Sequence, residues 1–168
     1  MRIVVVYYSN TGNTRRIAEL LARELGAELA EVTCQRYLSW YGPLAMAWDI
    51  FTRHLPVVDV IAPARAEFDL VVIGGPVWSA HAAPPILSLA SHWPETRKAF
   101  FVTCRGTSPS YPPEPAIAEM RQALAGGADV PSEIFREADV NSVRAAGLAR
   151  AFADRIAAAA ATSRDEPR

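Results

Sequence analysis

Residues 3–16 read IVVVYYSNTGNTRR, an apolar run followed by a polar turn and then by a helical pattern. The run at 3–7 is short, β-branched and without polar alternation, which is typical of a strand covered on both faces. Apolar residues from Ile17 to Leu25 then recur at helical spacing, and Gly26 stands where a helix ends. The stretch therefore predicts a strand, a turn and a helix, the unit from which parallel sheets are built.

The same alternation continues along the chain. Further strands are predicted at 27–34, 68–74, 99–103 and 133–136, and further helices are predicted to begin at Pro84, near Glu114 with an end at 126–127, and after Asn141 as the cap. Five strands alternating with helices imply one parallel sheet wrapped on both sides, because parallel neighbours need crossover connections. We expect one domain over 1–161 and a flexible tail over 162–168.

Composition limits the classes of function. The chain has 168 residues, 51% of them hydrophobic, and a net charge of −1, so no basic patch argues for nucleic acid. No apolar run is long enough to cross a bilayer and no signal segment opens the chain, so we expect a cytoplasmic protein without a membrane span. Cys34 and Cys104 lack metal-ligand spacing and are interpreted as buried small hydrophobes, and no metal site is predicted.

The segment 35–63 is longer than a plain crossover. Within 37–55, aromatic and leucine residues recur at steps of three and four, a helical stripe interrupted at Gly42 and Pro43. Such stripes usually form core, so an extra helix packed on the body is the first interpretation. A dimer surface, which would make the protein a homodimer, or a lid over a ligand is the alternative.

The polar turn after the first strand predicts an anion site. In a doubly wound sheet, ligands bind beyond the carboxyl ends of the strands, where the strand order reverses. Gly12 lets backbone N–H groups close around an anion at the start of the helix, where the helix dipole favours negative charge. Hydroxyls and amides come from Ser9, Asn10, Thr11, Asn13 and Thr14. The turn is interpreted as a phosphate cradle, and a polar turn without a ligand is the alternative.

Other phosphate-binding loops are excluded by residues that the turn lacks. It has no lysine, as a G-x-x-x-x-G-K-[ST] loop requires, and no G-x-G-x-x-G spacing. A phosphatase turn would need a nucleophilic cysteine, and a receiver domain would need acidic residues at the end of the first strand. Neither feature is present.

Residues 9–14, SNTGNT, resemble the FMN phosphate loop of the flavodoxin family, in which small hydroxyl residues bracket a Thr-Gly pair after the first strand. The resemblance extends along most of the chain, because 74–81, GGPVWSAH, and 103–108, TCRGTS, occupy the places of the second and third flavin loops. It implies a flavodoxin-like three-layer α/β sandwich, with five parallel strands in order 2-1-3-4-5 and a helical insertion after strand 2.

The resemblance also implies FMN as cofactor and names its binding residues. These are Ser9, Asn10, Thr11, Gly12, Asn13, Thr14, Pro76, Val77, Trp78, Ser79, Thr103, Cys104, Arg105 and Gly106. Trp78 is the expected wall for the isoalloxazine, with structural packing as the alternative. Arg105 either points inward and raises the flavin potential or faces solvent. For His81 and Tyr111, a place beside the flavin and a place away from it both stay open.

We interpret the chain as an FMN-dependent oxidoreductase that moves hydride or electrons through the flavin, from NAD(P)H to a quinone or other small acceptor. No general acid or nucleophile is evident, so no catalytic side chain is predicted. A non-enzymatic electron carrier between redox proteins is the first alternative, and a flavodoxin-like scaffold with a degenerate pocket is the second. The nearly neutral charge departs from strongly acidic carriers and favours the enzyme.

Overall fold

The computed structural model describes residues 1–61, 68–93, 97–106, 111–125 and 130–162. In chain order the elements are β1 (Ile3–Tyr7), α1 (Asn13–Leu25), β2 (Glu28–Thr33), α2 (Gln35–Leu38), α3 (Gly42–Thr52), β3 (Asp59–Ile61), β4 (Leu70–Trp78), β5 (His81–Ala82), α4 (Pro84–His92), β6 (Arg97–Cys104), α5 (Glu114–Ala125), β7 (Ser132–Arg136), α6 (Glu137–Val140) and α7 (Arg144–Thr162). Strands and helices alternate as expected, because each apolar run is separated from the next by a helical pattern.

The sheet follows the order β3-β2-β1-β4-β6-β7, and β5 pairs with β4 off this path. The five strands β2, β1, β4, β6 and β7 are parallel neighbours, which confirms the predicted order 2-1-3-4-5. Two strands were not predicted. They are antiparallel, β3 on β2 and β5 on β4, and each is too short to show a periodicity in the sequence.

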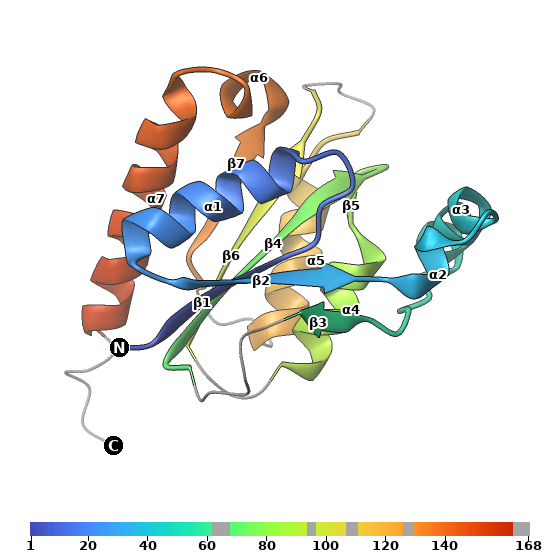
Figure 1. Ribbon diagram of the computed structural model, residues 1–168, viewed down its shortest axis with the longest axis horizontal. Helices are drawn as coiled ribbons and strands as arrows, with labels where there is room; N and C mark the ends of the chain where they lie inside the picture. Colours follow the sequence, from blue (N-terminus) through green and yellow to red (C-terminus); the bar gives the residue numbers. More distant parts are fainter. Residues whose placement is uncertain (62–67, 94–96, 107–110, 126–129, 163–168) are drawn as a thin grey trace.

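Helices cover both faces of the sheet, which gives the three-layer sandwich. Alternate residues of β1 point to opposite faces, so Val4 packs with Ile86 and Met120, whereas Val5 packs with Ile17 and Phe152. The first pair of helical residues comes from α4 and α5, and the second from α1 and α7. Figure 1 shows α1 and α7 on one face and α4 and α5 on the other.

Most helix boundaries agree with the sequence, and two differ. Gly26 ends α1 in a left-handed conformation (φ 60°), as expected. Asn141 does not cap the last helix, because the short helix α6 intervenes and Asn141 ends it. Ser142 takes the capping role, since its Oγ accepts the Arg144 N–H at 3.1 Å. Thr162, expected in the tail, belongs to α7. The predicted helix end at 126–127 and the tail at 163–168 lie outside the described residues.

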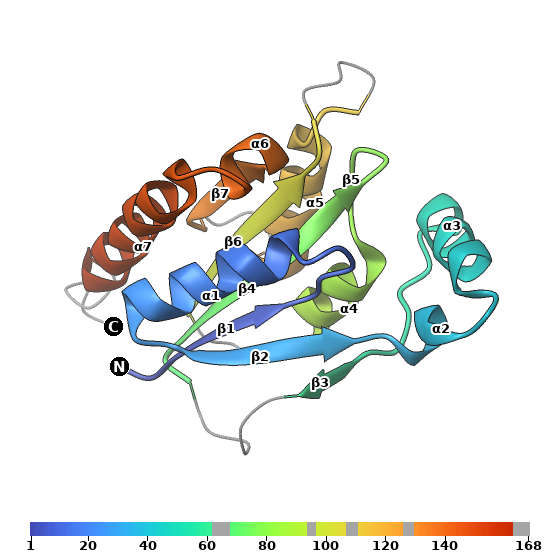
Figure 2. The ribbon, with the colours of Figure 1, turned by 45° about the horizontal axis from the view of Figure 1, so that its top comes forward.

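The insertion forms an arm, residues 35–57, that contains α2 and α3. Figures 1 and 2 both show this arm standing beyond the carboxyl end of β2, at one end of the molecule. The expectation that the aromatic stripe forms core is wrong, because α3 buries Gly42, Ala45 and Asp49 and leaves Leu44, Trp48 and Phe51 exposed. Among the helices in the described part of the chain, none is both long and apolar enough to cross a bilayer.

Candidate functional site

Three loops meet at the carboxyl edge of the parallel strands and enclose a cavity of about 450 Å³. They comprise the loop after β1, the end of β4 with its turn, and the end of β6 up to Arg105, and Figure 2 shows the ends of β1, β4 and β6 at this edge. The predicted residues along the cavity are Asn10, Thr11, Asn13, Pro76, Val77, Trp78, Ser79, Thr103, Cys104 and Arg105. The fold therefore brings together residues that are far apart in the sequence, at the edge where open α/β sheets bind ligands.

The loop after β1 presents the open start of α1. Gly12 is the residue before the helix and has φ 92°, a conformation that suits glycine. It has no side chain to cap the helix, and no side-chain cap is found at this end of α1. The first-turn N–H groups therefore lack a side-chain acceptor from the cap position. Ser9 shapes the loop instead, because its Oγ accepts the Gly12 N–H at 3.1 Å.

Hydrogen bonds join the first loop to the rest of the site. Thr14 and Thr103, both buried, share a hydrogen bond of 2.7 Å between their hydroxyls. Asn13 donates from Nδ2 to Glu137 Oε1 at 3.0 Å. These contacts tie the start of α1 to the end of β6 and to the start of α6. Of the predicted residues, Ser9, Gly12 and Thr14 thus support the first loop rather than line the cavity.

The loop after β4 is a tight hairpin. Trp78 pairs with His81 across it, and the two turn residues, Ser79 and Ala80, have φ of 50° and 69°. Each left-handed non-glycine residue costs roughly 1 kcal/mol, which the surrounding hairpin must offset. The turn therefore projects from the edge of the sheet in a fixed and strained form, beside the cavity.

Trp78 lies between the cavity and the core. It lines the cavity, and its ring also makes an edge contact with Tyr8, with centroids 5.8 Å apart. The ring of Tyr37, from the arm, lies 6.2 Å away. Burial, with a smaller contribution from Cys34, raises the pKa of Tyr8 to about 12, so this phenol stays neutral. Stacking of Trp78 on a flavin thus remains a prediction, while its structural packing is observed.

A second cavity of about 290 Å³ adjoins the first. Both are lined by Val77, Ser79, Cys104 and Arg105, so they form two compartments of one groove. Gly106 and Tyr111 line only the second compartment. Tyr111 is therefore placed beside the groove, and contact between Tyr111 and a flavin stays a prediction.

Arg105 and Glu137 are the two charged residues among the described residues that line the first cavity. The Arg105 side chain is 86% exposed, and its Nε lies 3.6 Å from Glu137 Oε2. Arg105 therefore faces solvent, and the inward orientation is not seen. Glu137 was missed by the sequence reasoning, although its place directly after the last parallel strand could have indicated this edge.

Other candidate groups are neutral or lie elsewhere. Cys34 and Cys104 are buried and free, as expected. Burial raises the pKa of Cys104, and the opposing effect of Arg136 is smaller, so the thiol is protonated at neutral pH. Arg15 turns away from the cavity, since it binds Tyr7 Oη at 3.1 Å and Glu31 at 2.6 Å.

His81 points away from this groove. Its Nδ1 lies 2.7 Å from Glu119 Oε1 on α5, and the Ala82 N–H donates to Glu119 Oε2 at 3.0 Å. It lines a separate cavity of about 270 Å³ between α3, α4 and α5. His81 therefore anchors the β4–β5 hairpin to α5, and it is not among the described residues that line the groove.

Sheet order, layers and groove together define a flavodoxin-like fold with a groove at the carboxyl edge of the strands. Many solved structures share this fold, among them the following three. A flavoprotein from Lactobacillus acidophilus in complex with FMN has a TM-score of 0.62 and 24% identity, covering 83% of this chain and 96% of that one. A flavodoxin, WrbA-like protein from Agrobacterium tumefaciens has a TM-score of 0.58 and 19% identity, covering 96% and 98%. Oxidised Flavodoxin 1 from Bacillus cereus has a TM-score of 0.51 and 17% identity, covering 92% and 98%.

Comparison by sequence finds weaker similarity than comparison by structure. No family model matches the sequence. A curated relative, an uncharacterized protein of Archaeoglobus fulgidus, is 29% identical over 103 residues, which cover 60% of this chain and 63% of that protein. The match thus spans less than two thirds of the relative's length. At these identities the comparisons establish the flavodoxin-like fold.

Proposed function

We propose that the protein binds FMN in the groove and acts as a flavoprotein oxidoreductase. The observation that carries the proposal is the open start of α1, where Gly12 leaves first-turn N–H groups without a side-chain cap beside the hydroxyls of the loop. The two compartments have the size of ordinary small-molecule sites. Solved structures of the same fold include one in complex with FMN, which supports this choice of ligand.

The residues present fit a phosphate and a flat ring. Thr11 and Asn13, with the N–H groups of α1, would hold the phosphate, and the hairpin and third loop would hold the ring between Val77, Trp78 and Tyr111. Bound FMN would supply the transfer of hydride or electrons, and the protein its orientation and electrostatics. The cysteine in the groove is neutral, so we assign no protein nucleophile.

A comparison of FMN with riboflavin tests the phosphate cradle. The two ligands share the ring system, and only FMN carries the phosphate. We expect the apoprotein to bind FMN at least about a hundredfold more tightly, because the start of α1 stabilises the dianion. Fluorescence titration measures both constants. Equal affinities would overturn the phosphate cradle, and a colourless protein that ignores added FMN would overturn the proposal and leave a scaffold.

The electron donor and acceptor define the finer proposal. We infer an enzyme that takes hydride from NAD(P)H and reduces a quinone or another small acceptor, because the chain has a net charge of only −1 and lacks the strong acidic field that guides a carrier to basic partners. Purified protein loaded with FMN should oxidise NADH or NADPH when a quinone is added. Reduction only in the presence of a separate reductase would instead identify an electron carrier.

Glu137→Gln is expected to tighten FMN binding about threefold, because a half-buried carboxylate in the groove repels the phosphate and such partly screened charges are worth less than about 1 kcal/mol. The difference should shrink at high salt, which screens the charge. Titration of Glu24→Gln, at the far end of α1, is the control. Weaker FMN binding by Glu137→Gln would mean that its hold on Asn13 and Arg105 matters more than its charge.

A further inference from the structure

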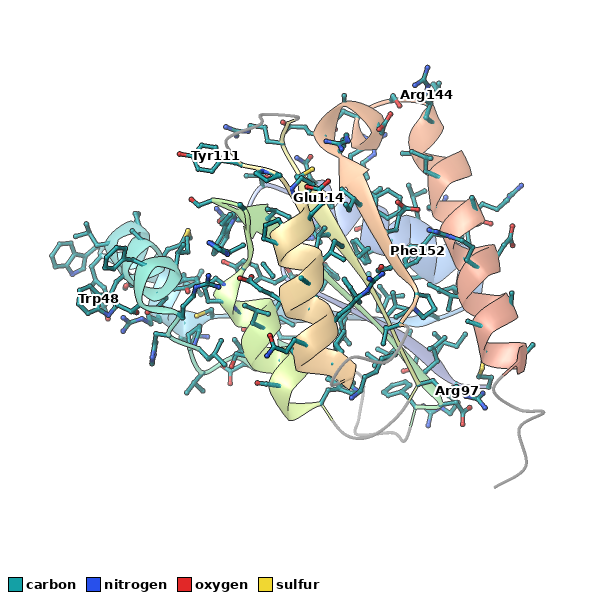
Figure 3. The ribbon with its side chains drawn as sticks, turned by 180° about the vertical axis from the view of Figure 1, so that it is seen from behind. Trp48, Arg97, Tyr111, Glu114, Arg144 and Phe152 are labelled. Carbon is teal, nitrogen blue, oxygen red and sulfur yellow. The ribbon has the colours of Figure 1, made fainter. Side chains whose placement is uncertain are left out.

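Helix α3 of the arm is largely apolar and leaves one apolar face uncovered. The residues it turns toward the protein are Gly42, Ala45 and the carboxylate of Asp49, all buried. The residues it turns outward are apolar and large: Leu44 is 73% exposed, Trp48 61% and Phe51 86%. Figure 3 places Trp48 at the outer end of the molecule. A surface helix normally shows the opposite pattern, so this face lacks a partner.

The arm is held in a fixed shape. Asp49 accepts hydrogen bonds from Arg36 at 3.0 and 3.2 Å and from Tyr37 Oη at 3.0 Å. Arg53, just after α3, forms an ion pair with Glu119 on α5. The helices α2 and α3 also pack closely, since a Cβ on Gly42 would lie 2.2 Å from the Tyr37 carbonyl oxygen. The exposed face is therefore formed before any partner binds, which lowers the entropic cost of association.

The exposed apolar residues of the arm form what we call the arm surface. It consists of Leu38, Trp40, Tyr41, Leu44, Trp48, Phe51, Leu55 and Val57. The largest apolar patch of an ordinary monomer measures about 300–600 Å², and one aromatic side chain covers about 150–250 Å². The four aromatic members are 44% to 91% exposed, and with the four exposed aliphatic members the apolar area of the arm surface is on the order of the roughly 800 Å² that each subunit contributes to a stable interface.

The structure argues against two candidate partners of the arm surface, the protein's own ligand and a membrane. A lid over the protein's own ligand does not fit, because no arm residue is among the described residues that line the groove. A membrane surface would call for basic residues free to meet lipid headgroups. Both arginines of the arm, Arg36 and Arg53, are instead paired with carboxylates.

The composition of the arm fits a protein partner. Residues 35–57 contain tryptophan, tyrosine, phenylalanine and methionine but neither lysine nor glutamate, as in the buried centre of protein interfaces. Leu44, Trp48 and Phe51 form a stripe with Trp48 at its middle, along a helix roughly 16 Å long. Two such stripes can pack antiparallel across a twofold axis, with Trp48 near the axis and Leu44 facing Phe51 of the other copy.

We propose that the arm surface is the interface of a homodimer, in which a second copy of this chain packs its α3 antiparallel to the first. The charges at the arm are satisfied within each subunit, so burial of this surface leaves no unpaired ion. The interface also lies one aromatic contact from the groove, through Tyr37 and Trp78. The proposal does not depend on the ligand that the groove binds.

Sedimentation velocity of the full chain tests the proposal. We expect a dimer at micromolar concentration, and we expect Trp48→Glu and Leu44→Glu each to raise the dissociation constant at least about a hundredfold, as loss of a central apolar contact does. Val143→Glu is the matched control, because Val143 is 98% exposed and lies outside the arm. Far-UV circular dichroism of each variant verifies that it is folded.

Three results would overturn the proposal. The first is a wild-type protein that stays monomeric at micromolar concentration. The second is a folded Trp48→Glu variant and a folded Leu44→Glu variant that both dimerise like Val143→Glu. The third is a monomer that floats with phosphatidylcholine vesicles in a density gradient, since that would show that a lipid surface covers the arm. FMN titration of the same samples reports on the groove separately.

Discussion

Gly12→Asp is expected to weaken FMN binding about a thousandfold while leaving the protein folded. An aspartate at this position places a carboxylate beside the N–H groups that we assign to the phosphate, at a left-handed backbone conformation (φ 92°) that costs a non-glycine residue about 1–3 kcal/mol. Its negative charge also repels the phosphate. Two like charges about 4 Å apart repel each other by about 4 kcal/mol at an effective dielectric constant of about 20. Because each 1.4 kcal/mol changes the affinity tenfold, this repulsion corresponds to about a thousandfold. Fluorescence titration with FMN measures the change.

Gly147→Asp is the control for this substitution. Gly147 lies on the exposed side of α7, and a Cβ there meets no atom within 4 Å. The same chemical change at that position should leave FMN affinity unaltered. If Gly12→Asp kept its affinity within tenfold of the wild type, the phosphate would have to bind elsewhere in the groove.

Gly74→Ala is expected to lower the free energy of unfolding by about 1–3 kcal/mol, as overpacking of a core does. Gly74 is in β4, and a Cβ there would lie 2.1 Å from Cζ of Phe101. That ring is fully buried and meets Phe135 edge-on at 5.8 Å between centroids, so it has little room to move. Guanidinium unfolding monitored by circular dichroism gives the value.

Two comparisons isolate the clash at Gly74. Gly147→Ala should raise the free energy of unfolding by about 0.5–1 kcal/mol, because alanine is the better helix former and the site is open. Adding Phe101→Leu to Gly74→Ala should cost less than the sum of the two single changes, since both act at one contact. Equal stability of Gly74→Ala and Gly147→Ala would mean that the sheet adjusts without cost.

Local patterns predicted the five parallel strands and the long helices between them. The β-branched run at 3–7, the helical spacing to Leu25 and the stop at Gly26 each depend on short-range physics, and each is found in the structure. The parallel sheet follows from the alternation of strands and helices, because crossovers permit few other arrangements. The placement of the three loops at one edge then follows, because the carboxyl ends of parallel strands lie at the same edge of the sheet.

Contacts between distant segments could not be predicted in this way. Glu137 reaches Asn13 across the fold, and Arg105 turns to Glu137 rather than into the groove. His81 was ambiguous because its partner, Glu119, comes from a helix far along the chain. Such contacts depend on how the fold places distant segments next to each other. The spacing of residues within one segment does not reveal that distance.

The arm shows most clearly which features the sequence determines and which features only the tertiary structure decides. By itself the sequence determined that 37–55 would be helical and interrupted at Gly42, because apolar spacing and a glycine-proline break act locally. Which face of α3 turned inward was decided by tertiary structure, since burial of Asp49 with Arg36 and Tyr37 fixes the rotation of the helix and leaves Trp48 outside. A hydrophobic stripe predicts a helix face that favours burial, but the packed structure decided that this face is turned outward.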